Sequence, residues 1–119
     1  MQLFETRPTA ASRALQVWLV LIGKAHNRQT MTYGHLAELL GYERAGTLAQ
    51  ILGRLYHYCS QNGLPPLTAL VVNQQTGLPG EGLPDIDLHA QREKVFTHQW
   101  YDQYPPTEDQ LEEAYQNQK

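Results

Sequence analysis

Residues 30–55 read TMTYGHLAELLGYERAGTLAQILGRL, and this stretch decides the fold. It holds two short segments with apolar residues at helical spacing, separated by Gly41 and a small charged turn. Thr32 is suited to cap the first helix, and a glycine at its end favours the left-handed conformation that stops a helix. The stretch therefore predicts a helix-turn-helix, with helices over residues 33–40 and 45–61.

A longer amphipathic helix is predicted over residues 10–26, ahead of this motif. Thr9 follows a proline and is a suitable N-cap. Apolar residues then recur at helical spacing, which predicts one buried stripe and makes this helix the spine of the core. The stripe consists of Ala11, Leu15, Trp18, Leu19, Ile22 and Ala25, widened by Val17, Val20 and Leu21.

The pattern of the chain changes after the second helix of the motif. The run LTALVVN at 67–73 is apolar and β-branched, which predicts a buried strand. A glycine-containing turn follows, and Pro79 and Pro84 leave residues 78–84 either a short return edge or an open loop. Further helices are predicted over 88–100, with Leu88, Val95, Phe96 and Trp100 packed inward, and over 107–119, where TEDQ at 107–110 has capping-box spacing.

These elements predict one α+β domain over residues 1–119. It is mainly helical, of the winged helix-turn-helix type, with a β-hairpin wing near 67–83 and an acidic C-terminal helix. A chain of 119 residues with 41% hydrophobic content suits one domain with a modest core.

Composition also bounds the compartment and the partners. Mean hydropathy is −0.51, and the absence of a long apolar run predicts that the chain does not enter a membrane. The first residues lack the pattern of a signal peptide, and a single cysteine allows no internal disulfide. The expected localisation is cytoplasmic.

The charges divide unevenly along the chain. Residues 1–63 carry six Lys or Arg and three acids, whereas residues 64–119 carry three Lys or Arg and nine acids. Such a split is typical of a nucleic-acid face with an acidic back, although a scatter of a few charges gives the same count.

Two motifs point to a known family. TYG at 32–34 precedes the helix pair, and LPPLTALVVNQQTGLPGEG at 64–82 follows it. Together they resemble the DNA-binding domain of O6-alkylguanine-DNA alkyltransferases and of the non-enzymatic alkyltransferase-like proteins. The resemblance covers about residues 30–82, and it implies a winged helix that binds DNA. It also implies that Tyr33 lies against the DNA backbone at the target nucleotide.

The chain departs from that family where the chemistry would occur. The enzymes carry a nucleophilic cysteine in a Pro-Cys-His-Arg segment, whereas here Pro66 is followed by LTAL. Cys59 is predicted on the inner face of a helix, where burial would raise its pKa and suppress the thiolate. The position of the family's arginine finger falls near Gly46, with Arg44 close by. We therefore expect no enzymatic activity.

The outer face of the 45–61 helix is the predicted DNA-binding surface. Glutamine side chains pair with adenine edges and arginine side chains with guanine edges, and a recognition helix enters the major groove. The alternatives are an ordinary solvated face and, for Tyr33, a half-buried ring that holds the 33–40 helix against the wing. The predicted DNA-binding residues are Tyr33, Arg44, Thr47, Gln50, Arg54 and His57.

Other chemistries find little support in the sequence. The five histidines lack metal-ligand spacing, no serine lies in a nucleophile elbow, and no glycine-rich loop has phosphate-loop form. Asp85 with Glu93 and Lys94 has the wrong spacing for a metal-dependent nuclease. We expect no metal and no cofactor.

Two functions remain from the sequence. The first is a non-enzymatic protein, alkyltransferase-like or regulatory, that binds double-stranded DNA. The alternative is a small acidic protein-binding module, such as an adaptor, an inhibitor or an immunity-type protein, on a winged-helix scaffold. Its acidic C-terminal segment would attract a basic protein partner. The acids of that segment are Glu108, Asp109, Glu112 and Glu113.

Overall fold

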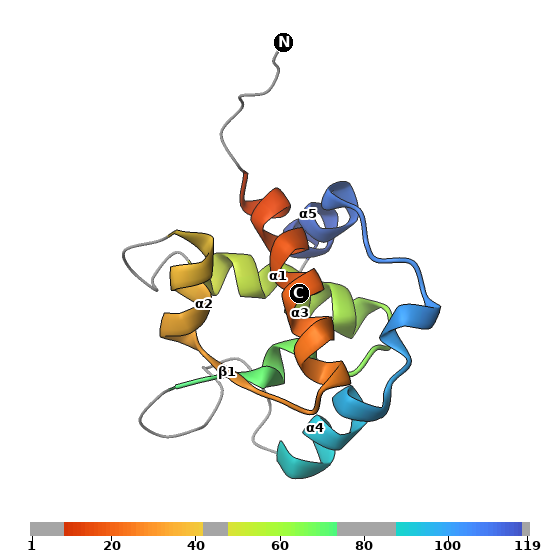
Figure 1. Ribbon diagram of the computed structural model, residues 1–119. Helices are drawn as coiled ribbons and strands as arrows, with labels where there is room; N and C mark the ends of the chain where they lie inside the picture. Colours follow the sequence, from red (N-terminus) through yellow and green to blue (C-terminus); the bar gives the residue numbers. More distant parts are fainter. Residues whose placement is uncertain (1–8, 42–47, 74–87, 118–119) are drawn as a thin grey trace.

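A computed structural model describes residues 9–41, 48–73 and 88–117. These residues form a mostly helical domain in which α1 lies against most other elements (Figure 1). The elements are α1 (Ala10–His26), β1 (Met31–Thr32), α2 (Tyr33–Leu40), α3 (Leu48–Gln61), the 3-10 helix η1 (Leu67–Leu70), β2 (Val71–Val72), α4 (Leu88–Thr97), the 3-10 helix η2 (Trp100–Asp102) and α5 (Glu108–Gln116).

Helix α1 forms the spine of the core, as predicted. Its first turn is capped by Thr9, whose side-chain oxygen accepts a hydrogen bond from the Ser12 N–H at 3.0 Å. Trp18 is buried and packs edge-on against Tyr58 and Trp100, with ring centroids 5.6 and 5.5 Å apart. The prediction is wrong for one member of the stripe, because Leu19 is 51% exposed and lies on the solvent side of the helix.

The helix pair of the motif has the predicted bounds wherever it is described. The Thr32 side chain accepts a hydrogen bond from the His35 N–H at 3.1 Å, and Gly41 ends α2 with φ of 80°. Helix α3 is described from Leu48, so the predicted start at 45–47 lies outside the described residues. Figure 1 shows α2 running across the direction of α3.

The segment predicted as a long strand is mostly a 3-10 helix. Residues 67–70 form η1, and only Val71 and Val72 are in a strand. That strand pairs in parallel with β1, with Met31 opposite Val71, so the predicted antiparallel hairpin is wrong for β2 as described. Helices α1 and α3 pack on η1, which is buried throughout, and a compact turn satisfies this burial as well as a strand does. The predicted return edge near 74–83 lies outside the described residues.

The C-terminal elements α4, η2 and α5 all pack against α1. Helix α4 ends at Thr97, earlier than the predicted 100, and Trp100 is buried in the separate turn η2. Val95 is buried and Phe96 is partly buried, as predicted. Leu88 is the first residue of α4, and its side chain is not among those that the structure describes. The capping box of α5 is confirmed by two hydrogen bonds, from the Gln110 N–H to the Thr107 hydroxyl and from the Thr107 N–H to the Gln110 side chain.

Helix α5 is part of the core. It buries Leu111 and Ala114 and packs on both α3 and α1. The acidic segment predicted over 107–119 is therefore a docked helix with one apolar face, and it is described as far as residue 117.

The described fold agrees with the coarse class α+β, because five helices accompany one two-stranded sheet in these residues. The winged-helix assignment stays a prediction. Among the described residues, no helix has both the length and the apolar character needed to cross a membrane.

Candidate interaction surfaces

Arg54 was predicted on the open outer face of α3, and this prediction is wrong. The residue is only 7% exposed because α5 packs over it. Its Nε donates a hydrogen bond to Glu112 Oε1 at 2.8 Å, and its Nη1 donates one to the Gln50 carbonyl at 2.8 Å. The guanidinium carbon also lies 4.1 Å from the centroid of the Tyr115 ring. Its charge is thus committed to α5 and is removed from solvent.

The same helix face carries further contacts with α5. Gln61 donates a hydrogen bond to the Ala114 carbonyl at 2.8 Å, and the partly buried His57 ring lies 6.3 Å from the Tyr115 ring. A Cβ added at Gly53 would lie 2.9 Å from Tyr115 Cε1, so glycine is what allows this close approach. On the face of α3 predicted to enter a DNA groove, Arg54 is thus buried and His57 partly buried, whereas Gln50 and Gln61 are exposed.

The other predicted DNA-binding residues are spread over several places. Gln50 is exposed at the N-terminal end of α3. Tyr33 is partly buried and packs against the core. The partial burial agrees with the alternative predicted for this ring, whereas most of the predicted wing lies outside the described residues. Arg44 and Thr47 lie outside the described residues. The described structure therefore does not bring the six residues together on one exposed face.

Cys59 has the burial and the chemistry predicted for it. It is 1% exposed, and this burial raises the pKa of its thiol to about 11, although a backbone hydrogen bond from Leu67 acts in the other direction. The thiol is consequently protonated at neutral pH, and a protonated thiol is a poor nucleophile.

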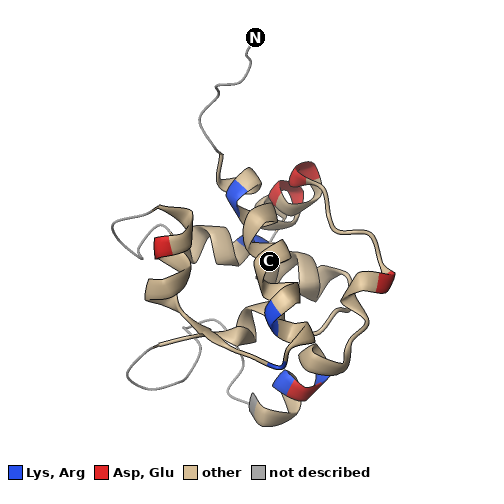
Figure 2. Cartoon of the chain, in the orientation of Figure 1, with Lys and Arg blue, Asp and Glu red and all other residues tan. Residues whose placement is uncertain are grey.

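Among the described residues, basic and acidic side chains form two main groups. Figure 2 shows Lys and Arg gathered where the end of α1 meets α4, and a group of Asp and Glu on α5. At the basic end, Arg28 pairs with Glu93 and lies 5.0 Å from the Phe96 ring centroid. The hydrogen bond from Arg28 lowers the pKa of Glu93. Arg92 donates to the Ala69 carbonyl at 3.2 Å, and partial burial lowers its pKa. Two of the basic side chains are thus engaged by the protein itself.

Large apolar side chains are exposed around α1, and sequence reasoning did not identify them. Leu19, Tyr101 and Tyr104 are 51%, 63% and 94% exposed. The Tyr101 hydroxyl lies 3.9 Å from where a Cβ on Gly23 would be, and Gly23 is one helical turn from Leu19. We call Leu19, Tyr101 and Tyr104 the α1–η2 surface.

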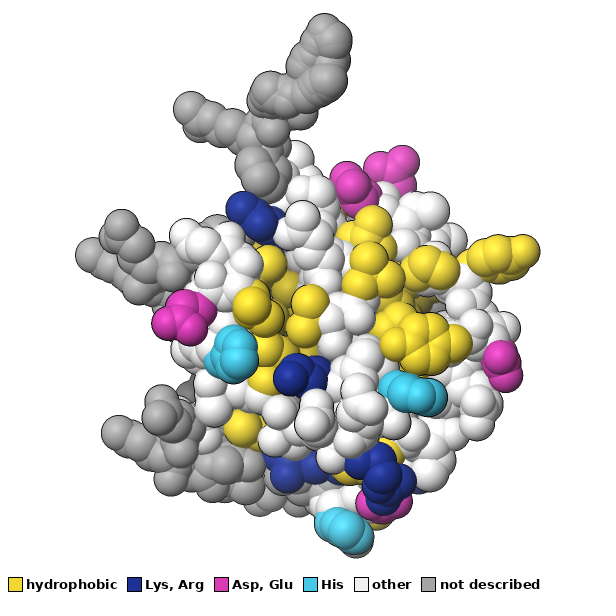
Figure 3. Space-filling model, viewed as in Figure 1, with side chains coloured by type: hydrophobic (Ala, Val, Ile, Leu, Met, Phe, Trp, Pro, Cys, Tyr) yellow, Lys and Arg dark blue, Asp and Glu magenta, His cyan; other side chains and the backbone are white. Residues whose placement is uncertain are grey.

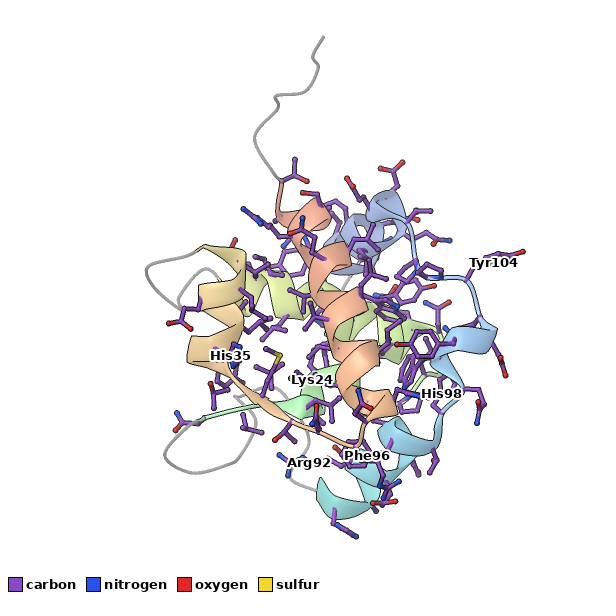
Figure 4. All side chains as sticks on the ribbon, in the orientation of Figure 1. Lys24, His35, Arg92, Phe96, His98 and Tyr104 are labelled. Atoms are coloured by element: carbon purple, nitrogen blue, oxygen red, sulfur yellow. The ribbon has the colours of Figure 1, made fainter. Side chains whose placement is uncertain are left out.

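Figure 3 shows hydrophobic side chains gathered on the face of the molecule over α1 and beside it, and Figure 4 shows Tyr104 pointing outward from the loop after η2. A signal for this tyrosine was present in the sequence: Pro105 and Pro106 follow it, and consecutive prolines hold a chain extended. Nothing in the period of α1 distinguished Leu19 from its buried neighbours.

Acidic side chains border the α1–η2 surface along the chain. Asp102 adjoins Tyr101, and Glu108 and Asp109 open α5 just after the two prolines; all three are exposed. In the described part of the chain neither of the two ion pairs involves them. This combination of exposed aromatic rings and unpaired carboxylates is the most distinctive surface feature of the described residues.

A metal centre finds no counterpart in the residues described. No group of three or more His, Cys, Asp or Glu side chains there could hold a metal ion. No protein-family model matches the chain, and no curated protein or solved structure matches it either.

Proposed function

We propose that the protein is a binding module that captures a basic, apolar segment of another protein on the α1–η2 surface. The observation that carries this proposal is the exposure of Leu19 and Tyr101 on two elements in contact, α1 and η2, with Tyr104 exposed on the loop that follows η2. Single exposed apolar residues are ordinary, but a contiguous group with polar edges is typical of protein interfaces. Tyrosine is also among the residues that contribute most to binding energy at such interfaces.

The charge of the border indicates the chemistry of the partner. Asp102, Glu108 and Asp109 are exposed and lie close in the chain to Tyr101 and Tyr104, and complementary charge steers association and selects partners. A segment that presents lysine or arginine beside leucine-like side chains fits both features. The proposal develops the acidic protein-binding alternative, which the sequence attributes to the C-terminal segment, by adding the neighbouring apolar side chains.

A pair of matched peptides tests the proposal. A helical peptide of leucine and lysine in an amphipathic pattern is expected to bind, whereas the same pattern with glutamate in place of lysine should bind at least about tenfold more weakly. Tyr101→Gln and Leu19→Gln should each weaken binding of the lysine peptide about tenfold, which is the loss of roughly 1.4 kcal/mol of apolar contact. Fluorescence anisotropy measures both.

Leu39→Gln is the control for these variants. The exposed fraction of Leu39, 56%, is similar to that of Leu19, but Leu39 lies on α2. This substitution should leave the affinity unchanged, because α2 is not part of the proposed surface. Equal losses from Leu39→Gln and Leu19→Gln would show non-specific adhesion and would remove the proposal.

A second candidate function is non-enzymatic DNA binding through α2 and α3. What supports it is the crossing of the two helices, with Gln50 exposed at the start of the second one (Figure 1). On this reading the contacts come from Tyr33, Gln50 and the segment with Arg44 and Thr47. The burial of Arg54 under an acidic helix favours the protein-binding proposal over this one. Neither function requires a cofactor.

A further inference from the structure

One aromatic side chain protrudes from the loop between η2 and α5. Tyr104 is 94% exposed, and Figure 4 shows it pointing outward from this loop. The loop is held on both sides of the tyrosine, because Trp100 is buried in η2 and Pro106 is buried just before α5. A tyrosine side chain has only two rotatable torsions, so it loses little conformational freedom when another surface covers it. Tyr104 is therefore suited to act as an anchor.

A groove elsewhere on the molecule has the size and the lining to receive such a ring. It lies between the end of α3, residues 63–66 and α4, and its volume is about 390 Å³. Sites that enclose small molecules have volumes of about 300–1,000 Å³, so the groove has room for one phenol ring. Tyr56 lines it from α3, and Pro65 and Pro66 form a wall without N–H groups. The groove shares no residue with the α1–η2 surface.

The charges beside the protruding ring and beside the groove are opposite. Asp102, Glu108 and Asp109 are exposed and lie close to Tyr104 along the chain. Lys94 is exposed and lines the groove from α4. Within the described ranges, neither ion pair involves any of these four charged residues. Each side thus offers the charge that the other lacks, and complementary charge favours association.

We propose that the protein self-associates by inserting Tyr104 of one copy into the groove between α3 and α4 of a second copy. The ring lies against Tyr56 and the proline wall, and the acids near Tyr104 face the Lys94 ammonium. The inference rests on the proposed function, because it takes part of the α1–η2 surface as the anchor and names a second copy as the partner. A surface that complements a different surface of the same chain gives a head-to-tail contact.

Two variants that each lack one half of the contact test the proposal by sedimentation equilibrium. The contact is smaller than a standard interface, so the average mass of the wild type should rise only as its concentration approaches the millimolar range. Tyr104→Ser removes the ring, and Ser60→Trp fills the groove from an exposed position on α3. Each should weaken self-association at least about tenfold.

A mixture of the two variants is the sharpest arm of the test. It keeps one intact contact, between Tyr104 of the Ser60→Trp protein and the open groove of the Tyr104→Ser protein. The mixture should therefore associate at concentrations where neither variant does alone. Ala49→Trp is the control, because it adds the same side chain at an exposed position of α3 outside the groove, and it should associate like the wild type. Circular dichroism confirms that the variants are folded.

Three results would overturn the inference: a wild type that stays monomeric at millimolar concentration, a mixture that associates no better than its components, or equal losses from Ala49→Trp and Ser60→Trp. The leucine and lysine peptide separates this inference from the proposed function. If the wild type is monomeric but binds the peptide, only the self-association is wrong. If it neither associates nor binds the peptide, both proposals are wrong.

Discussion

Leu111→Ala is expected to lower the free energy of unfolding by about 3 kcal/mol, in the middle of the range for buried leucine truncations. Leu111 is 0% exposed and anchors α5 on the core formed by α1 and α3. The loss combines the transfer of the removed methyl groups with the cavity left behind. Urea unfolding followed by circular dichroism measures it.

Leu39→Ala provides the matched control for this truncation. Leu39 is 56% exposed, so the same chemical change should shift the unfolding free energy by less than about 0.5 kcal/mol. A loss below about 1 kcal/mol for Leu111→Ala would mean that α5 does not belong to the core. The burial of Arg54 would then also be in contradiction, because α5 is the helix that covers this residue.

Glu112→Ala is expected to destabilise the fold by about 2 kcal/mol. The substitution leaves the Arg54 guanidinium, whose side chain is 9% exposed, without its carboxylate. Breaking a fully buried pair costs about 3–5 kcal/mol, but the Glu112 side chain is 38% exposed and water screens part of the interaction. Arg54 also keeps its hydrogen bond to the Gln50 carbonyl and its contact with the Tyr115 ring. Glu113→Ala, which changes an exposed neighbour, should be close to neutral.

The same ion pair gives the stability a pH dependence of known sign. Hydrogen bonds from Arg54 and then Gln116 lower the pKa of Glu112 in the folded state. A carboxyl with a lowered folded pKa stabilises the fold above its unfolded pKa, which is about 4.3, and loses this contribution as the pH falls through the folded value. The wild type should therefore lose more stability in this acid range than Glu112→Gln does. If the free energies of unfolding of the two proteins fell equally over this pH range, the assignment would be contradicted.

The local signals in the sequence were sufficient for α1, α2 and α5. Caps at Thr9, Thr32 and Thr107 and the stop at Gly41 are properties of neighbouring residues, and all four are present in the structure. Apolar spacing identified the buried face of α3, including Cys59. These features depend on a few consecutive residues, so they can be recognised without knowledge of the rest of the fold.

The errors arose where a distant segment decides the environment. Arg54 looks exposed from the period of α3 alone, and only the docking of α5 buries it, through partners 58 residues away in the case of Glu112. The 67–73 run contains strand-forming residues, but its partner is β1 before α2, and its first four residues fold as η1 beneath α1 and α3. No period in the sequence reports which helix will cover which face.

The candidate surfaces were missed for a related reason. Leu19 has the spacing of a buried residue, and its exposure follows from where η2 and α5 dock on α1. Tyr56 and Ser60 of α3 and Lys94 of α4 line one groove, although about thirty residues separate the two helices along the chain, and no local pattern predicts that they meet. Interaction surfaces of small domains are assembled by such tertiary contacts.

The protein-binding proposal and the DNA proposal differ in what the acids of α5 do. Removing residues 108–119 would test their charge poorly, because Leu111 and Ala114 are part of the core. Substitution of Glu108→Gln, Asp109→Asn and Glu113→Gln together removes the exposed charges and keeps the apolar face of the helix. On the DNA proposal, this triple variant repels phosphate less and should bind duplex DNA more tightly at low salt.

The most direct measurement is the affinity of the leucine–lysine peptide for this triple variant relative to the wild type at low ionic strength. The protein-binding proposal predicts a loss of about tenfold, because the variant removes Glu108 and Asp109 from the border of the α1–η2 surface and a third acid, Glu113, from the same helix, each worth a few tenths of a kcal/mol. Duplex DNA in the same buffer should bind neither protein. An unchanged peptide affinity, together with tighter duplex binding by the triple variant, would contradict the proposal and assign the function to α2 and α3.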